Sequence, residues 1–223
     1  MRTTDYVNIG SLAEKTTSWL GRVRESVPER SHFLIDPSRC VLLVIDMVHY
    51  FADPAGRCYL PATGAITGRI RQLLEAWRRC GSTVVFTRHG HMGDHDLGML
   101  GRFFSDYIRA EEPESEIISS LAPQPDEVVF RKTTYDAFLN TPLTALLTKR
   151  GIEQVLITGV LTHMCCETTA RSAFCRGFEV YVPADATASH CEEQHLGSLL
   201  AMADSVAVVM STEEILKRCE TNQ

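Results

Sequence analysis

The sequence lacks the features that mark membrane, nucleic-acid-binding and exported proteins. Among its 223 residues, no apolar run approaches the ~18 residues that a membrane-spanning helix needs. The formal net charge is −6, and no lysine- and arginine-rich tract marks a nucleic-acid-binding surface. The first residues, Met1 to Asp5, do not have the charged-then-apolar layout of a signal peptide. We therefore expect a cytoplasmic protein with a small-molecule substrate, no nucleic-acid partner and no membrane association.

Paired cysteines are also missing, although the chain contains eight cysteines. None has the C-x-x-C spacing of a structural zinc site, and a disulfide framework is not expected without export. We expect most of the thiols to be reduced and buried, where they behave as small apolar side chains. The eight are Cys40, Cys58, Cys80, Cys165, Cys166, Cys175, Cys191 and Cys219.

No internal repeat, low-complexity tract or domain linker divides the chain. Hydrophobic residues make up 44% of the sequence, which is enough for one ordinary globular domain with a large core. The sequence therefore predicts one domain over residues 1–223. Within it, residues 1–37 are too few to form a core of their own, and we expect them to pack on the core as an N-terminal arm.

Apolar runs alternate with helix-compatible segments along the rest of the chain. Continuous runs such as Cys40 to Ile45 are typical of strands buried on both faces of a parallel sheet. Between them, segments such as Ala62 to Cys80 place apolar residues at the spacing of a helix. Strands alternating with helices imply right-handed crossovers and a three-layer α/β/α sandwich. The predicted strands are 40–45, 82–87, 127–130, 155–158, 178–183 and 205–210.

Three chemically active side chains follow predicted strands. Asp46 and Lys132 come at or near the ends of two of them, and Cys165 lies where a third turns into a helix. Open α/β sheets bind ligands at this edge. A helix N-terminus lowers a thiol's pKa and offers backbone N–H groups to an oxyanion, so we interpret Cys165 as a nucleophile. The alternatives are that Asp46 caps a turn and Lys132 is a surface side chain.

A histidine-rich loop, Arg88 to Asp96, follows the second predicted strand. Its three imidazoles and two carboxylates leave a divalent metal site open, but the run is rich in glycine, and a plain surface loop is a further alternative. We favour a loop that contacts substrate. Aromatic residues near the other strand ends are expected to wall the same pocket, and Phe103, Phe104 and Tyr107 to cover it. The predicted substrate-binding residues are Tyr50, Phe51, Arg88, His89, His91, Tyr135 and Phe138.

Three motifs resemble the isochorismatase-like hydrolases. They are Val44 to Met47, Arg131 to Leu143 and Gly159 to Cys165, in the order of that family, and the likeness spans about residues 38–217. The resemblance implies a six-stranded parallel sheet in the order 3-2-1-4-5-6. It also implies a homo-oligomer, a dimer or tetramer, and a catalytic triad of Asp46, Lys132 and Cys165.

The resemblance also places an oxyanion hole at the backbone N–H groups of Leu161 and Cys165, beside a cis peptide bond that maps to Val160–Leu161. Members with this triad, such as N-carbamoylsarcosine amidase, ureidoacrylate amidohydrolase and nicotinamidase, cleave small amides. Isochorismatases carry glycine where this chain has Cys165, which argues against their reaction. Nicotinamidases bind a metal through an aspartate and histidines after the second strand. No aspartate stands in that register here, so neither metal nor cofactor is predicted.

These observations predict a cysteine-dependent hydrolase that cleaves a C–N bond of a small amide or ureido compound through a thioester. Three alternatives remain open. They are an isochorismatase-type vinyl-ether hydrolase, a non-enzymatic binding protein on the same fold, and a redox role for the neighbouring Cys165 and Cys166. Adjacent cysteines bridge poorly for geometric reasons, so we interpret Cys166 as a packing residue.

Overall fold

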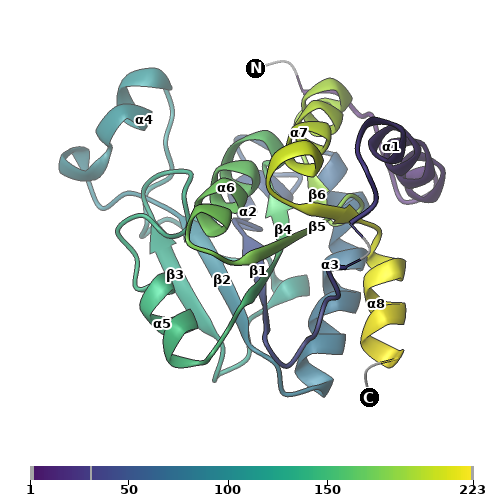
Figure 1. Cartoon of the computed structure of the whole chain (residues 1–223). Coiled ribbons are helices and arrows are strands. Elements are labelled where there is room, and N and C mark those ends of the chain that lie inside the picture. Colours follow the sequence, from purple (N-terminus) through teal and green to yellow (C-terminus); the bar gives the residue numbers. More distant parts are fainter. Residues whose placement is uncertain (1–2, 31, 222–223) are drawn as a thin grey trace.

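The fold is built on one parallel β-sheet with helices on both faces (Figure 1). The computed structural model describes residues 3–30 and 32–221, so residues 1, 2 and 31 of the expected arm lie outside the described part. The strands are β1 (Cys40–Ile45), β2 (Val84–His89), β3 (Val128–Lys132), β4 (Gln154–Val160), β5 (Glu179–Pro183), β6 (Thr187–Ala188) and β7 (Val208–Met210). The helices are α1 (Leu12–Ser26), α2 (His49–Ala52), α3 (Ala62–Arg79), α4 (Gly98–Phe103), α5 (Leu143–Lys149), α6 (Glu167–Cys175), α7 (Glu192–Ser205) and α8 (Thr212–Thr221).

The strand order confirms the predicted topology. Neighbouring strands run β3-β2-β1-β4-β5-β7, and every pair is parallel. β7 occupies the place of the predicted sixth strand. The short strand β6 was not predicted; it pairs with the end of β4 through Gly159 and Val160. Because β1 and β4 lie at the centre of the order, their carboxyl ends meet in the middle of the sheet edge.

The predicted element bounds hold within a few residues, with one larger difference at the last strand. The apolar run was expected to form a strand from Ser205, but α7 continues to Ser205 and β7 begins at Val208. The backbone N–H groups of Val206 and Ala207 both donate to the Met202 carbonyl, which completes the last turn of the helix. The β-propensity of this run favours a strand, but local hydrogen bonds at the end of α7 hold Val206 and Ala207 at the helix terminus instead.

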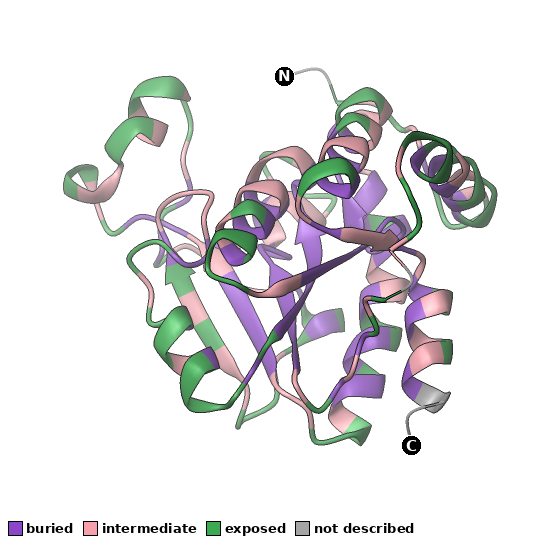
Figure 2. Ribbon diagram, viewed as in Figure 1, coloured by how far each residue is buried: buried purple, intermediate pink, exposed green. Residues whose placement is uncertain are grey.

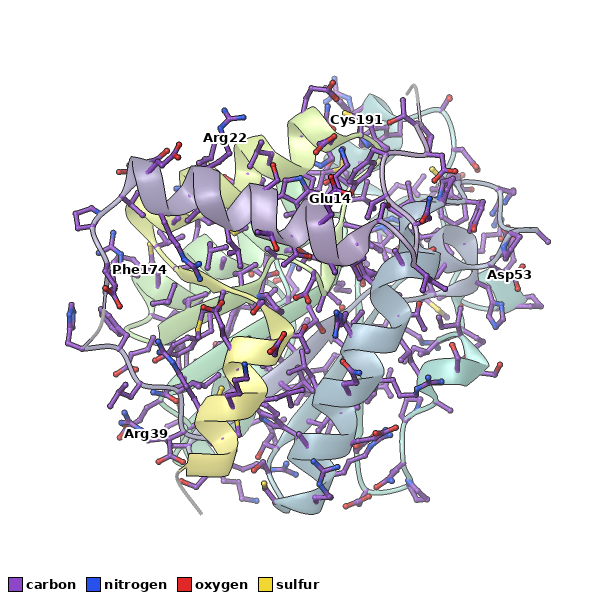
Figure 3. The ribbon with its side chains drawn as sticks, turned by 90° about the vertical axis from the view of Figure 1, so that its right-hand side faces the viewer. Glu14, Arg22, Arg39, Asp53, Phe174 and Cys191 are labelled. Atoms are coloured by element: carbon purple, nitrogen blue, oxygen red, sulfur yellow. The ribbon has the colours of Figure 1, made fainter. Side chains whose placement is uncertain are left out.

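Helices α3 and α8 pack together on one face of the sheet, while α6 and α7 pack together on the other (Figure 1). The view turned by 90° shows α3 and α8 side by side, with α1 running across the top (Figure 3). The burial pattern follows this layering, because β1 and β4 are buried along their whole lengths whereas the outward faces of the helices are exposed (Figure 2). The core thus lies between the central strands and these helices.

The N-terminal segment packs on the sandwich through α1, which contacts α7. Trp19 is 1% exposed, and its indole N–H donates to Glu192 at the start of α7. Its ring meets the buried His195 edge-on, with centroids 4.5 Å apart. Ahead of the helix, the Thr4 backbone N–H donates to the His190 carbonyl. These contacts bring the beginning of the chain to the edge of the sheet at which β4 ends.

The described residues contain no helix with both the length and the apolar content to cross a membrane.

Candidate active site

The carboxyl ends of β1 and β4 approach unusually closely, and a glycine makes this approach possible. Gly159 pairs with Ile45 and has a φ of +104°, a left-handed conformation that L side chains rarely adopt. A Cβ atom at this position would lie 2.0 Å from the Ile45 carbonyl oxygen. The next residues contain the cis Val160–Leu161 peptide bond that the family resemblance implied. The chain then winds through a short π-helical turn, Thr162–Cys166, into α6.

Asp46, Lys132 and Cys165 come together at this edge of the sheet. Lys132 Nζ lies 2.6 Å from Asp46 Oδ2 and 3.3 Å from Cys165 Sγ. Besides burial, the charge of Asp46 also acts on the Cys165 thiol and raises its pKa. All three residues are buried, with exposures of 0%, 2% and 5% for Asp46, Lys132 and Cys165. Three chain segments far apart in the sequence therefore bring a carboxylate and a thiol to one ammonium group, which contacts both.

Two threonines that the sequence did not single out complete the surroundings of this cluster. The Thr87 hydroxyl donates to Asp46 Oδ1 at 2.8 Å, which fixes the carboxylate from the side of β2. Lys132 donates to the Thr134 carbonyl at 2.9 Å. Lys132 therefore has three acceptors, one for each ammonium hydrogen: a carboxylate, a thiol sulfur and a backbone carbonyl.

The structure corrects the expected ionisation of the thiol. The helix N-terminus was expected to lower the pKa of Cys165, but burial raises it to about 12, and the negative charge of Asp46 adds to this effect against the opposing charge of Lys132. Burial also disfavours the charged form of Lys132. The charges of Asp46 and Cys165 outweigh that effect, and the pKa of Lys132 lies above its usual range. In the resting site the thiol is protonated beside an Asp46–Lys132 ion pair.

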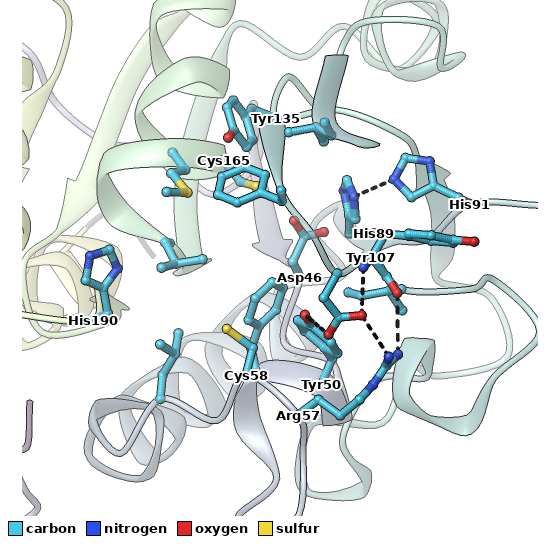
Figure 4. Close-up of a pocket in the computed structure, with 18 of the residues that line it drawn as sticks. Asp46, Tyr50, Arg57, Cys58, His89, His91, Tyr107, Tyr135, Cys165 and His190 are labelled. Atoms are coloured by element: carbon cyan, nitrogen blue, oxygen red, sulfur yellow. Dashed lines mark hydrogen bonds and ion pairs between the residues drawn. The ribbon is translucent and has the colours of Figure 1, made fainter. Parts of the chain in front are cut away.

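A cavity of about 320 Å³ opens onto this cluster (Figure 4). Asp46 and Cys165 lie on its wall together with Leu161, whose backbone N–H is the second predicted oxyanion donor. Five of the seven predicted substrate-binding residues also line it: Tyr50, Phe51, His89, His91 and Tyr135. Further lining residues that the sequence did not single out are Thr3, Arg57, Cys58, Leu60, Leu100, Ser105, Asp106, Ile108, Met164 and His190.

Two predicted substrate-binding residues lie elsewhere. Arg88 is directed away from the cavity and donates to the Ala110 carbonyl and the Ser115 hydroxyl, because successive side chains of β2 point to opposite faces of the sheet. Phe138 is 4% exposed and stacks on Phe178 in the core, with centroids 5.9 Å apart. For both residues the expected contact with substrate is wrong, and both have structural contacts instead.

The predicted histidine loop places two imidazoles against each other. His89 Nε2 lies 3.1 Å from His91 Nε2 (Figure 4). His91 Nδ1 lies 3.0 Å from the Asp96 carbonyl oxygen. Burial, reinforced by the positive charge of Lys132, lowers the pKa of His89 to about 3, so its ring is neutral. In the described part of the chain, no three histidine, cysteine, aspartate or glutamate side chains are grouped to hold a metal ion.

The wall opposite the cluster comes from the irregular segment around α4. Phe104 and Tyr107 line the cavity, as expected, but Phe103 is 75% exposed and points elsewhere. Arg57 joins this segment to the loop after α2 through Asp106, Glu112 and Glu114. Nothing in the local pattern indicated Arg57, because its partners lie about fifty residues further along the chain.

No disulfide joins the cysteines of the described residues, and fewer of the thiols are buried than expected. Cys40, Cys165, Cys166 and Cys219 are buried, whereas Cys58, Cys80 and Cys175 are exposed and Cys191 is intermediate. Cys166 is fully buried in the core beside Cys165, and burial raises its pKa well above the usual value.

The doubly wound sheet, with a thiol, a carboxylate and an ammonium group at its central strand ends, defines an α/β protein with a candidate nucleophile. Comparison with known proteins identifies the family. The Isochorismatase domain model matches residues 40–214, so the chain belongs to the isochorismatase family of hydrolases. A cysteine hydrolase structure from Pseudomonas syringae pv. phaseolicola 1448A superposes with a TM-score of 0.82 at 30% identity, over 86% of this chain and 97% of that one.

Two relatives of this chain are named for different activities. Nicotinamidase 3 of Arabidopsis thaliana is 39% identical over 178 residues, which cover 78% of this chain and 85% of that protein. The isochorismatase of Bacillus subtilis (strain 168) is 32% identical over 186 residues, which cover 83% of this chain but 59% of that protein. The family is therefore established, and the reaction is decided by the side chains of this chain's own site.

Proposed function

We propose that this protein is a cysteine-dependent amidohydrolase that cleaves a C–N bond of a small amide or ureido compound, with Asp46, Lys132 and Cys165 as its catalytic triad. The observation that carries the proposal is that Lys132 contacts both Asp46 and Cys165, three buried side chains of which Asp46 and Cys165 lie on the cavity wall. A nucleophile within reach of a base that a third group holds in place is the arrangement that covalent catalysis requires.

The first half-reaction forms the thioester. Since the resting thiol is neutral, Asp46 accepts the Sγ proton as the sulfur attacks the substrate carbonyl carbon, and Lys132 stabilises the developing thiolate. The backbone N–H groups of Leu161 and Cys165 hold the oxyanion. Removing one donor of this kind typically costs roughly 10²–10³ in rate. Asp46 then gives its proton to the leaving nitrogen, the C–N bond breaks, and an amine or ammonia departs.

The second half-reaction restores the thiol. Asp46, again a carboxylate, accepts a proton from a water molecule, whose oxygen attacks the thioester carbonyl. The C–S bond breaks, the carboxylic acid is released, and the proton held by Asp46 returns to sulfur. Thr87 and Lys132 hold the Asp46 oxygens throughout, so the carboxylate keeps one orientation in both steps.

The cavity bounds the size of the substrate. At about 30 Å³ for each water-sized group, a volume of about 320 Å³ holds roughly ten non-hydrogen atoms. The aromatic walls at Tyr50, Phe51 and Tyr135 favour a flat molecule of that size. A peptide or a polymer would not fit.

A screen of small amides and ureides with ammonia detection tests the proposal, followed by mass spectrometry of the enzyme trapped with a slow substrate. We expect a mass increase that maps to Cys165, and loss of both turnover and adduct in Cys165→Ala. Turnover in Cys165→Ala close to that of the wild type would overturn the covalent scheme.

An isochorismatase-type vinyl-ether hydrolase is the second candidate, favoured by the 32% identity to the Bacillus subtilis isochorismatase. Cys165 weighs against it, because protonation of a vinyl ether needs no nucleophile. Assays of isochorismate with the wild type and Cys165→Ala separate the two reactions. A non-enzymatic binding protein on the same fold has no need of the triad, and a redox role would require Cys166 to leave the core.

The proposal also covers the oligomeric state and the cellular location of the enzyme. We propose a single-domain cytoplasmic enzyme that forms a homo-oligomer, a dimer or tetramer. The oligomer is supported by exposed apolar side chains on and near α4, where Met99 and Phe103 are 65% and 75% exposed. Light scattering of the purified protein measures the mass directly, and a monomer at micromolar concentration would contradict this part.

A further inference from the structure

Three buried polar atoms of residues that line the cavity have no hydrogen-bond partner among the described residues: Asp46 Oδ2, His89 Nδ1 and His190 Nδ1. Asp46 Oδ2 is in an ion pair with Lys132. His89 Nδ1 is shielded from solvent and makes no hydrogen bond with any described residue. The charge of Lys132 acts on His89, but its ammonium group is engaged with Asp46, Cys165 and the Thr134 carbonyl. A buried polar atom without a partner costs free energy, and at a ligand cavity the missing partner is a group of the ligand.

The neighbours of His89 decide whether this nitrogen donates or accepts. The Asp96 carbonyl can only accept, so the hydrogen in its contact with the imidazole of His91 belongs to His91 Nδ1. At a pH well above the ordinary pKa of an imidazole, where the ring is neutral, His91 Nε2 is then an acceptor, and His89 must donate to it from its own Nε2. A neutral His89 with hydrogen on Nε2 has a bare lone pair on Nδ1. The chain of hydrogen bonds therefore makes His89 Nδ1 an acceptor.

Asp96, the first residue in this series of hydrogen bonds, is itself held in place. The Asp96 carboxylate accepts from the Met92 backbone N–H and from Arg131, whose guanidinium lies 2.9 Å away. His91 is 1% exposed and cannot turn without losing both of its contacts. Since the loop fixes Asp96, and Asp96 fixes His91, the polarity at His89 Nδ1 does not depend on a freely rotating side chain.

We propose that His89 selects substrates by accepting a hydrogen bond from an N–H or O–H group of the substrate body. This inference rests on the proposed amidase function and narrows its substrate class. It favours ureido compounds and amides with a further hydrogen-bond donor. It disfavours pyridine carboxamides, whose ring nitrogen is an acceptor and would meet a second lone pair.

A panel of flat carboxamides bound to Cys165→Ala at pH 8, where imidazoles are neutral, tests the preference without turnover. Pyrrole-3-carboxamide carries a ring N–H, furan-3-carboxamide has the same shape without that donor, and nicotinamide has a ring acceptor. We expect the pyrrole amide to bind at least about tenfold more tightly than the other two, since a polar site rejects ligands that leave it unpaired. Equal binding of the pyrrole and furan amides, no measurable binding of the pyrrole amide, or tighter binding of nicotinamide would overturn the proposal.

Two further variants in the Cys165→Ala background show whether His89 is the cause. In His89→Phe the difference between pyrrole and furan amides should fall to within about twofold, because the acceptor is gone. His89→Asn places an amide oxygen near the position of Nδ1 and should restore the preference. Persistence of the preference in a folded His89→Phe variant contradicts the proposal, and the panel in Cys165→Ala decides it even if His89→Phe does not fold.

The proposed function can fail separately. If wild-type enzyme incubated with the tightest-binding amide forms no adduct on Cys165 and releases no amine, the amidase scheme is wrong while the binding preference stands. If the adduct forms and nicotinamide reacts and binds best, the amidase scheme stands and the role of His89 is wrong.

Discussion

The two walls of the active-site cavity are built in opposite ways. One wall consists of strand ends and the first turn after β4. It holds Asp46 and Cys165, with Lys132 in contact with both, and all three are at most 5% exposed. The other wall is the irregular segment around α4, which projects from the sheet and carries exposed Met99 and Phe103 (Figure 2). The first wall is fixed by backbone hydrogen bonds and core packing, and the second mainly by ion pairs near the surface.

This difference separates chemistry from specificity. A catalytic triad must keep its distances to within a fraction of an ångström, and the three residues proposed for that role lie where the sheet leaves no freedom. The irregular segment can change in sequence without disturbing the sheet, and it contributes side chains such as Leu100, Phe104 and Tyr107 to the part of the cavity that shapes the substrate. We therefore expect changes in the first wall to abolish the reaction or the fold, and changes in the second to alter affinity.

Replacement of the nucleophile has the largest expected effect. Cys165→Ala should lower kcat by roughly 10⁴-fold or more, as removal of a covalent nucleophile does in other hydrolases. The side chain is small, and its loss leaves the Asp46–Lys132 ion pair in place. Circular dichroism and substrate affinity should remain close to wild type. A variant that keeps more than a tenth of the activity would remove Cys165 from the mechanism.

The next largest effect is the pH dependence of thiol alkylation. Because only the thiolate reacts and the pKa of Cys165 is raised to about 12, the reactive fraction should rise about tenfold per pH unit from pH 7 to 10. Iodoacetamide labelling, followed by peptide mass spectrometry, measures this rate, with exposed Cys175 as the reference within the same molecule. A labelling midpoint near pH 8.5 or below would show that burial does not govern this thiol.

Stability should depend strongly on two first-wall positions. Lys132→Met leaves Asp46 as an unpaired buried charge and should lower the free energy of unfolding by about 3–5 kcal/mol. Gly159→Ala forces a Cβ atom into the Ile45 carbonyl at a left-handed φ and should cost roughly 2–5 kcal/mol. Urea denaturation measures both.

A matched control for the glycine is Gly68→Ala in α3, because a Cβ there meets no atom within 4 Å. That variant should be as stable as the wild type or slightly more so, since alanine is the better helix former. If Gly159→Ala were equally stable, the close approach of β4 to β1 would not be what positions the turn before Cys165.

The same contrast explains how much the sequence could predict. The strands were within reach because buried parallel strands leave continuous apolar runs, and the chemically active side chains follow them. The strand order and the proposed triad came from the family resemblance. The raised pKa of Cys165 could not be predicted from the sequence. The sequence indicated that Cys165 precedes a helix, but it did not indicate how deeply the thiol is buried. Arg88 could have been excluded: alternation along β2 places it on the face opposite to Thr87 and His89.

Apart from Phe104 and Tyr107, the second wall escaped prediction for a different physical reason. Its contacts join residues far apart in the chain through flexible charged side chains, and such pairs leave no periodic pattern. Arg57 and its acidic partners are the clearest case, since each is an ordinary surface residue when read alone. Phe138 illustrates the reverse error: an aromatic side chain near a motif was assigned to the pocket, but its ring stacks in the core.

The smallest effect is expected from Arg57→Ala, which tests the second wall. Arg57 pairs with Asp106 at 2.9 Å and with Glu112 at 3.0 Å, and it also pairs with Glu114. Its side chain is 43% exposed, so these pairs should contribute no more than about 1 kcal/mol to stability. Without them the segment loses the ion pairs to the loop after α2, although the Tyr50 hydroxyl still donates to Asp106 and the backbone N–H of residue 57 to Glu114. Three carboxylates are then left without their shared cation.

We therefore expect KM to rise several-fold in Arg57→Ala, with kcat within about twofold of wild type. Steady-state kinetics at low salt measure KM and kcat separately. Added salt should reduce the increase in KM, because it screens the repulsion between the carboxylates. Arg102→Ala, on α4 and without an ion pair among the described residues, is the matched control and should leave KM unchanged. A fall in kcat without a change in KM would mean that the second wall takes part in the chemistry, and the division between the two walls would fail.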